Sequence, residues 1–300
     1  MGDNALKEYI YKVYSSQKKR KKRNRRKQEE KDKLNSNPDL KQTLDANKIF
    51  ENKYKNQRCF VIGNGPSLNY LDLSILQGEY TFTVNQITRR KDFPNLKTNF
   101  HFWADPAFFR IDVNKPEDLE LLNVMKAVNT LDNHPIVFFP YSQKRFAKQF
   151  DLESELNIYY YEQRWGLGSE DIDYSSFVPG FHTVVHYCIT MAIYMGFKEI
   201  YLLGCDNTSL INTIKSAADM DVDEYGYLVS ENEKKRFKSL FEYQSLYDYV
   251  YSYLVVLKDY EKLNDYCKIR DIKLINCTKN SAIDCIMKKE LNEVLLDLGT

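Results

Sequence analysis

The sequence of 300 residues is long enough to fold around a sizeable core, and its 43% hydrophobic and 14% aromatic content excludes a chain that is disordered throughout. The net charge of +1 conceals an asymmetry. Residues 1–57 carry 17 Lys and Arg against 8 Asp and Glu, a net charge of +9, which leaves −8 for residues 58–300. The sequence therefore predicts an acidic packed body preceded by a basic region.

The sequence shows neither a run of about 18 apolar residues nor a signal-peptide pattern, so neither a membrane-spanning helix nor secretion is expected. The six cysteines lack the CxxC spacing of metal sites: Cys59, Cys188, Cys205, Cys267, Cys277 and Cys285. This scatter favours buried, reduced thiols over disulfides or a zinc site. The cytoplasm is the expected compartment, and no metal is expected.

Residues 1–57 are interpreted as a basic, amphipathic and partly disordered extension. From Lys18 to Lys27 every residue except Asn24 is Lys or Arg. The segment before it would place four apolar side chains on one helical face: Leu6, Tyr9, Ile10 and Val13. We hypothesise that residues 6–27 bind an anionic membrane on its inner face, and a solvated extension without a partner is an equal alternative. Nucleic acid is not expected, because the acidic body predicts no basic groove.

Short apolar runs in the body predict buried parallel strands. The runs are Arg58–Ile62, Tyr80–Val84, Phe100–Trp103, Pro135–Phe139, Glu199–Leu203 and Ile272–Ile275. A buried helix is predicted from Thr183 as its N-cap to Met195, with Gly196 as its stop, and the longest helix over 231–268. A helix running directly into a strand indicates an α/β fold with a mostly parallel sheet flanked by helices.

The turn Gly63–Ser67 directly follows the first predicted strand. Two glycines there would let the backbone approach a ligand, which is typical of a phosphate-binding turn. The turn is neither a Walker A loop nor a GxGxxG motif, since Leu68 stands where the third glycine would be. A tight strand connection without a ligand is an equal alternative.

Polar side chains follow four of the predicted strands. They are Asn64, Asn85, Asp105 and Asp206. A parallel sheet would bring them to one rim, where ligands of open α/β sheets bind. A single Asp at such a position is most simply interpreted as a cap of the next turn. The occurrence of a polar residue after four different strands is what supports a ligand-binding site.

Four ordered blocks resemble those of the bacterial single-domain sialyltransferases over about residues 58–285. The blocks are Gly63–Leu68, Val84–Gln86, Asp105–Pro106 before Phe108 and Phe109, and Gly196–Asp206. The same blocks are shared with a superfamily from surface-polysaccharide clusters that is similar to 6-hydroxymethylpterin diphosphokinase (MptE-like). The resemblance implies a Rossmann-like variant of the nucleotide-sugar transferase fold over residues 58–300.

The resemblance further implies a CMP-activated donor, a sialic-acid-like nonulosonate, and no cofactor besides this substrate. Carried over by motif, the donor-binding residues would be Asn64, Gly65, Ser67, Asn85, Asp105, Thr183 and Asp206. The first three would hold phosphate and sugar, Asn85 the nucleotide or its phosphate, and Asp206 the ribose or cytidine. Asp105 stands where the family has Asn, and Val184 stands where it has a serine.

The general base of the resembling family is a lid histidine after the position of Asp206, and this sequence has no histidine beyond that point. His182, before the predicted helix, is the candidate substitute, with simple capping or packing as the alternative. Tyr243 and Tyr247 lie in the region that replaces the lid histidine and are further catalytic candidates, with a core stripe as their alternative. Residues 207–236 have the position of a lid.

The expected function is that of a glycosyltransferase that uses a CMP-activated sugar to modify a surface glycan of the capsule or lipopolysaccharide type. One alternative is a magnesium-dependent diphosphokinase acting on a hydroxymethylpterin-like alcohol. A second is a non-catalytic nucleotide-binding scaffold. The expected partners are the donor and a glycan acceptor, and a homo-oligomer stays open.

Overall fold

The structure is a computed structural model that describes residues 21–130, 132–165, 172–211, 214 and 245–296. Nine strands form one sheet in the order β6-β5-β4-β3-β2-β1-β7-β8-β9. Every strand pairing in this sheet is parallel. The strands are β1 (Arg58–Ile62), β2 (Tyr80–Val84), β3 (Phe100–Phe102), β4 (Ile136–Pro140), β5 (Asn157–Trp165), β6 (Phe177–Gly180), β7 (Glu199–Leu203), β8 (Lys273–Asn276) and β9 (Met287–Lys288). The predicted α/β class with a parallel sheet is confirmed.

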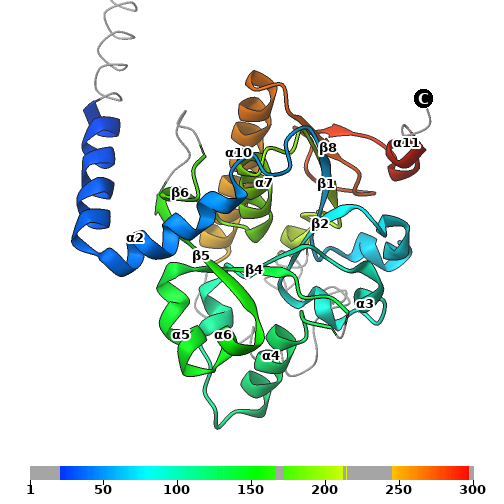
Figure 1. Cartoon of the computed structure of the whole chain (residues 1–300). Coiled ribbons are helices and arrows are strands. Elements are labelled where there is room, and N and C mark those ends of the chain that lie inside the picture. Colours follow the sequence, from blue (N-terminus) through cyan, green and yellow to red (C-terminus); the bar gives the residue numbers. More distant parts are fainter. Residues whose placement is uncertain (1–20, 131, 166–171, 212–213, 215–244, 297–300) are drawn as a thin grey trace, which may run out of the picture.

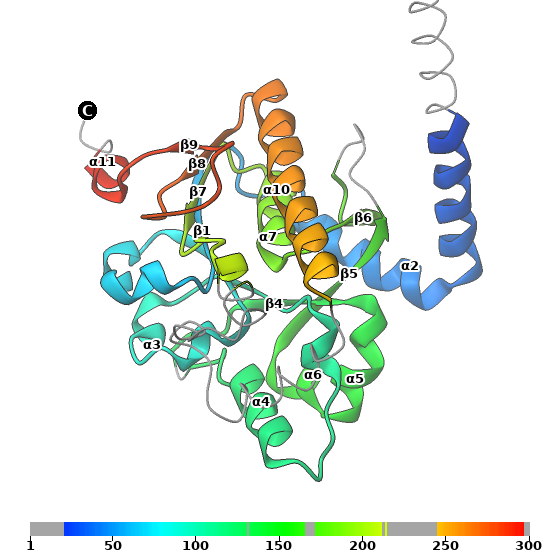
Figure 2. The ribbon, with the colours of Figure 1, turned by 180° about the vertical axis from the view of Figure 1, so that it is seen from behind.

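Helices lie on both faces of the sheet (Figures 1 and 2). They are α2 (Pro38–Asp45), α3 (Phe93–Leu96), α4 (Pro116–Lys126), α5 (Lys144–Gln149), α6 (Leu152–Glu155), α7 (Val184–Tyr194), α10 (Leu246–Ile269) and α11 (Leu291–Leu296). Short 3₁₀ turns follow several strands, among them Pro66–Tyr70 after β1, Asn85–Arg89 after β2 and Pro106–Phe109 after β3. No helix among the described residues is long and apolar enough to cross a membrane.

Side chains of each central strand enter two separate cores, because successive residues of a strand point to opposite faces. On β1, Cys59 and Val61 pack into the cluster that contains α7, whereas Phe60 and Ile62 pack into the cluster that contains α4. A strand buried on both faces consists of a continuous apolar run, which is why β1 and β7 were recognisable in the sequence.

The strand order reverses at the β1–β7 pair. The chain builds the sheet outward from β1 to β6 on one side, returns to β7 beside β1, and continues to β8 and β9 on the other side. Ile62 lies in register with Leu203, so the two strands end together. Such a reversal leaves a crevice at the carboxyl ends of the strands, where ligands of open α/β sheets bind.

Helix α7 points its amino end at this edge of the sheet. It connects the carboxyl end of β6 to the start of β7 and packs across β1, β2 and β3. Almost all residues of α7 are buried, because the helix packs between the sheet and α10. A helix that is covered on all sides is apolar around its whole circumference, as α7 nearly is. Gly196 ends the helical segment with φ +90°, as the sequence predicts.

Part of the predicted extension packs into the body. Leu40 and Leu44 of α2 are fully buried against Phe177, and Phe50 lies in the main core. The Asn47 amide donates to the carbonyls of Tyr160 and Tyr174, at 2.8 Å each. The packed body therefore begins about twenty residues before Arg58, at α2.

Candidate functional site

The loops after β1 and β7 are joined by backbone hydrogen bonds. Gly63 N–H donates to the Leu203 carbonyl and Gly65 N–H to the Gly204 carbonyl, both at 2.8 Å. The approach excludes side chains: a Cβ at position 63 would lie 2.5 Å from the Gly204 carbonyl oxygen, and one at position 65 would lie 1.8 Å from Asp206 Oδ2. The two glycines therefore serve close packing of the β1 loop against the β7 loop.

Ser67 and Asp206 bind each other across this junction. The Ser67 hydroxyl donates to Asp206 Oδ2 at 2.7 Å, and the Ser67 N–H donates to Oδ1 at 3.0 Å. Asp206 is only 5% exposed, and burial raises its pKa although the bonds from Ser67 oppose the rise. Contacts of Gly65, Ser67 and Asp206 with a donor stay predictions. In the structure these groups contact one another.

Asn64 and Asn85 bring two unused acceptors to the rim. The Asn64 side-chain amide donates to the Val84 carbonyl at 3.1 Å, which places it beside Asn85. Asn85 has a left-handed backbone with φ +49°. The Oδ1 atoms of both residues are buried and have no hydrogen-bond partner within the described structure. Because buried polar atoms are normally paired, these two are candidates for contact with a ligand.

Two further amides at this edge were missed in the sequence. Asn207 directly follows Asp206, and Asn276 is the last residue of β8. The Nδ2 atom of each is buried without a partner among the described residues. Their position at the end of a strand or shortly after it is the signal that would have identified them, as it did Asn64 and Asn85.

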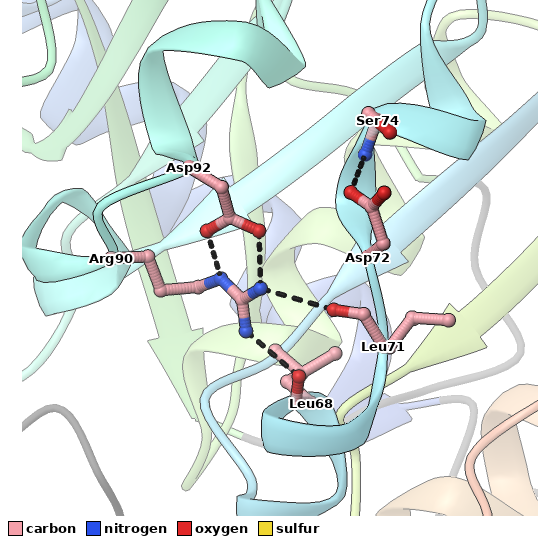
Figure 3. A network of polar contacts seen from close by, with 6 residues as sticks. All are labelled: Leu68, Leu71, Asp72, Ser74, Arg90 and Asp92. Atoms are coloured by element: carbon pink, nitrogen blue, oxygen red, sulfur yellow. Dashed lines mark hydrogen bonds and ion pairs between the residues drawn. The ribbon is translucent and has the colours of Figure 1, made fainter.

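Arg90 ties the β1 loop to the β2 loop (Figure 3). Its guanidinium donates to the carbonyls of Leu68 and Leu71, at 2.8 and 3.1 Å, and forms a two-point ion pair with Asp92. Asp72 caps the next turn by accepting from the Ser74 N–H at 2.9 Å. The planar fork of an arginine makes all these bonds at once, so Arg90 fixes the spacing of the two loops that carry Asn64 and Asn85.

An Arg90→Lys variant is expected to lose about 2 kcal/mol of unfolding free energy, because a lysine ammonium cannot keep both carbonyls and both carboxylate oxygens bonded. Chemical denaturation measures this loss. Arg145→Lys, at an exposed position of α5, is the matched control and should be neutral within about 0.5 kcal/mol. Equal stability of the two variants would contradict the role given to Arg90.

The amino end of α7 carries main-chain donors that bind no other described residue. Thr183, the N-cap, makes no side-chain capping bond. The N–H groups of Val184 and Val185 also have no partner within the described part of the chain. A helix amino end attracts anions through such groups and through the helix dipole. Thr183 was predicted to contact the donor, and this geometry is compatible with that prediction.

His182 is the histidine exposed at this edge. Its side chain is 37% exposed, and its Nδ1 lies 4.0 Å from Oδ2 of Asp259, a buried residue of α10 whose carboxylate also pairs with Lys262. His186, one turn further along, is fully buried, and its ring centroid lies 4.1 Å from that of Tyr260. His182 is therefore better placed than His186 to exchange a proton with a substrate.

Of the remaining predicted site residues, Asp105 and Tyr247 make contacts of their own, and Tyr243 lies outside the described residues. Asp105 accepts from the Ala107 N–H at 2.8 Å and caps the turn Pro106–Phe109. Tyr247 is 76% exposed in the first turn of α10 and stacks on Tyr251, so it does not belong to a core stripe. Tyr243 lies outside the described residues, as does most of the predicted lid at 207–236.

A cavity of about 580 Å³ lies at the opposite edge of the sheet, lined by residues such as Ser74, Lys97 and Thr130 that precede β2, β3 and β4. It is therefore not part of the rim formed by Asn64 and Asn85. The described residues include no group of three or more His, Cys, Asp or Glu side chains that would hold a metal ion.

Comparisons with known proteins identify a family and one similar solved structure. No curated protein matches this chain. The sialyltransferase CstII from Campylobacter jejuni, solved in complex with the substrate analogue cytidine-5'-monophosphate, is similar with 19% identity and a TM-score of 0.41, over 79% of this chain and 86% of that chain. A family model described as 6-hydroxymethylpterin diphosphokinase MptE-like matches residues 33–210, more than half of the sequence. The chain therefore belongs to the MptE-like family.

Proposed function

We propose that the protein is a nucleotide-dependent transferase whose nucleotide binds at the carboxyl ends of β1, β2 and β7. The observation that carries the proposal is the pair of buried acceptors on Asn64 and Asn85, which have no partner among the described residues. They lie where the strand order reverses, the position at which open α/β sheets bind nucleotides. Exocyclic amino groups and ribose hydroxyls are donors that such acceptors would bind.

The charge of the site favours a donor with few negative charges. Arg89 pairs with Glu120 at 2.7 Å, and Arg90 is bound to Asp92, so both arginines beside the β2 loop already contact carboxylates. Main-chain N–H groups at the amino end of α7 are donors without a partner in the described part of the chain. Such groups suit a single phosphodiester or a carboxylate. We therefore propose a CMP-activated, sialic-acid-like sugar as the donor and a surface glycan as the acceptor.

In this proposal the side chains bind and orient the two substrates. Asn64 and Asn85 hold the nucleotide, and the amino end of α7 faces the donor's anionic group. An acceptor hydroxyl oxygen forms a bond to the anomeric carbon while the bond from that carbon to the phosphate oxygen breaks and CMP leaves. His182 accepts the hydroxyl proton, with Asp259 stabilising the resulting imidazolium.

Replacement of Asn64 by Ala is expected to weaken CMP binding about tenfold, because the ligand loses an acceptor while the loop keeps its backbone bonds. Isothermal titration calorimetry measures the affinity. Asn69→Ala, at an exposed position of the same loop, is the control and should bind CMP like the unaltered protein. Equal affinities of the two variants would remove Asn64 from the site.

Replacement of His182 by Ala is expected to lower turnover about a hundredfold or more and to leave CMP affinity within twofold, because a general base acts on the chemical step. His134→Ala, exposed in the loop before β4, is the matched control. Full turnover of the His182 variant would show that another group accepts the proton.

A second candidate function is diphosphate transfer from ATP to a hydroxymethylpterin-like alcohol, and the family match favours it. Such reactions use Mg²⁺ to neutralise the phosphates. Both Asp206 oxygens are bound by Ser67 and the described residues offer no metal cluster, so they do not fit a protein-held magnesium ion and no step is assigned to one.

One experiment separates these functions. The purified protein is incubated with CMP-sialic acid and, separately, with ATP and a hydroxymethylpterin, each with and without magnesium. The proposed transferase releases CMP without metal, whereas the diphosphokinase releases AMP only with magnesium and the pterin. Nucleotide binding without release of either product would favour the non-catalytic scaffold and contradict both enzyme proposals.

A further inference from the structure

The helix over residues 21–36 is held to the body by its carboxyl half (Figures 1 and 2). Leu34 packs with Leu40, Leu44 and Phe177 in a small apolar cluster. Glu30 pairs with Arg164 of β5 at 3.4 Å, and Lys33 pairs with Glu162 at 3.2 Å while its ammonium lies 5.0 Å from the Phe177 ring centroid. These contacts anchor one end of the helix and fix its direction.

The amino half of this helix is a basic arm, defined here as residues 21–27. Six of its seven residues are Lys or Arg. Only Arg26 is half-buried, on the same side as Glu30 and Leu34, and the other five cations are exposed. An ion pair of Arg25 with Glu29 joins two exposed side chains, so it neutralises little of this charge. The arm therefore presents a dense positive surface beyond the anchored half.

We propose that the basic arm docks the protein on an anionic lipid bilayer. The body after residue 57 has a net charge of −8 and is repelled by the same surface. At about 1.5 Å per residue, the helix between Lys21 and Glu30 is about 13 Å long, and electrostatic forces in physiological salt decay over about 8 Å. The arm can thus contact the headgroups while much of the repulsion on the body is screened.

A bilayer fits these observations better than nucleic acid does. A nucleic-acid site would continue from the arm as a basic groove. At the base of the arm the carboxylates Glu30, Glu162 and Asp39 instead pair with the cations there, which are Arg164, Lys33 and Lys144. A flat anionic surface needs contact with the arm alone, and the sequence before it, with Leu6, Tyr9, Ile10 and Val13, predicts an apolar second signal of the kind that stable peripheral binding requires.

The test is cosedimentation of the full chain with two kinds of vesicle. One contains about 30% phosphatidylserine, an anionic lipid that gives a leaflet its negative surface potential, and the other is pure phosphatidylcholine. A variant carries Gln at four exposed positions of the arm: Lys21, Lys22, Arg25 and Lys27. Glutamine keeps the helix propensity of the originals. A matched variant carries Gln at four exposed lysines of the body: Lys41, Lys97, Lys115 and Lys268. Both variants have the same net charge. A difference in vesicle binding between them therefore shows that the position of the removed charges matters.

The proposal predicts binding to the anionic vesicles only, and release at high salt. The arm variant should partition at least about a hundredfold more weakly, since each basic residue near such a surface strengthens partitioning about fivefold. The body variant should stay within about fivefold of the unaltered protein. Absence of anionic-vesicle binding, equal binding of the two variants, or tighter binding to a DNA or RNA duplex at the same salt concentration would each overturn it. Circular dichroism at 222 nm checks that both variants stay helical.

Discussion

A Gly65→Ala variant is expected to lose at least about 3 kcal/mol of unfolding free energy and to lose CMP binding. Gly65 has φ −74° and ψ 155°, angles that any residue adopts, so the effect is steric. The added methyl carbon would lie 1.8 Å from Asp206 Oδ2 and 2.7 Å from the Gly204 carbonyl oxygen. Asp206 must then move, which breaks both bonds from Ser67 in a buried place.

Gly78→Ala is the matched control for this variant. Gly78 has φ +90°, where an alanine is strained, but a Cβ there meets no atom within 4 Å. It should therefore cost about 1 kcal/mol through backbone strain alone and leave CMP binding unchanged. Denaturant unfolding and calorimetry measure the two effects. If the Gly65 variant were as stable as the Gly78 variant and bound CMP normally, the β1–β7 junction would not be as tight as described.

The second large effect is acid destabilisation by two buried histidines. His101 accepts or donates one bond with the Thr83 hydroxyl at 2.9 Å inside the sheet, and both ring nitrogens of His186 are unpartnered among the described residues. Burial lowers the pKa of each from 6.5 to about 3. Both rings are therefore neutral in the folded protein at pH 5 and protonated in the unfolded chain.

Between pH 6.5 and about 3 the unfolded chain consequently binds more protons than the folded protein, so the free energy of unfolding falls as the pH is lowered. Near pH 5 the expected loss is about 2.7 kcal/mol per pH unit, the value for two protons. The stability that depends on these two histidines being neutral is fully present above pH 6.5. Denaturant unfolding at pH 7, 6 and 5 measures it.

A His186→Phe variant tests the assignment. Phenylalanine keeps the ring contacts with Tyr260 and Phe181 and removes no hydrogen bond seen among the described residues. In this variant the slope of the unfolding free energy against pH, near pH 5, should fall to the value for about one proton. His134→Phe, at an exposed position, should leave the slope of the unaltered protein within half a proton. An unchanged slope in the His186 variant would show that this histidine is protonated in the folded state.

The central strands were predictable because they are buried on both faces and apolar throughout. β1, β2 and β7 match the predicted ranges, and the helix after Thr183 matches α7. β5 was missed because its side chains are aromatic and polar and show no continuous apolar run. β6 was missed because Pro179 and Gly180 are rare in strands, and an edge strand tolerates them.

The rim of the site follows from the sequence, whereas its contacts do not. Polar residues directly after parallel strands must gather at one edge, and Asn64, Asn85 and Asp206 do so. The pairing of Ser67 with Asp206 joins residues 139 positions apart. Asp259 on α10 lies close to His182, which precedes α7. Such contacts depend on how layers pack, which local patterns do not encode.

The site's location is tested most directly by a crystal structure of the protein with CMP. We expect the nucleotide at the carboxyl ends of β1, β2 and β7, with hydrogen bonds to Asn64 and Asn85 and with its phosphate near the amino end of α7. CMP in the cavity beside Ser74 and Lys97 at the opposite edge, or a crystal that takes up no CMP at saturating concentration, would contradict it.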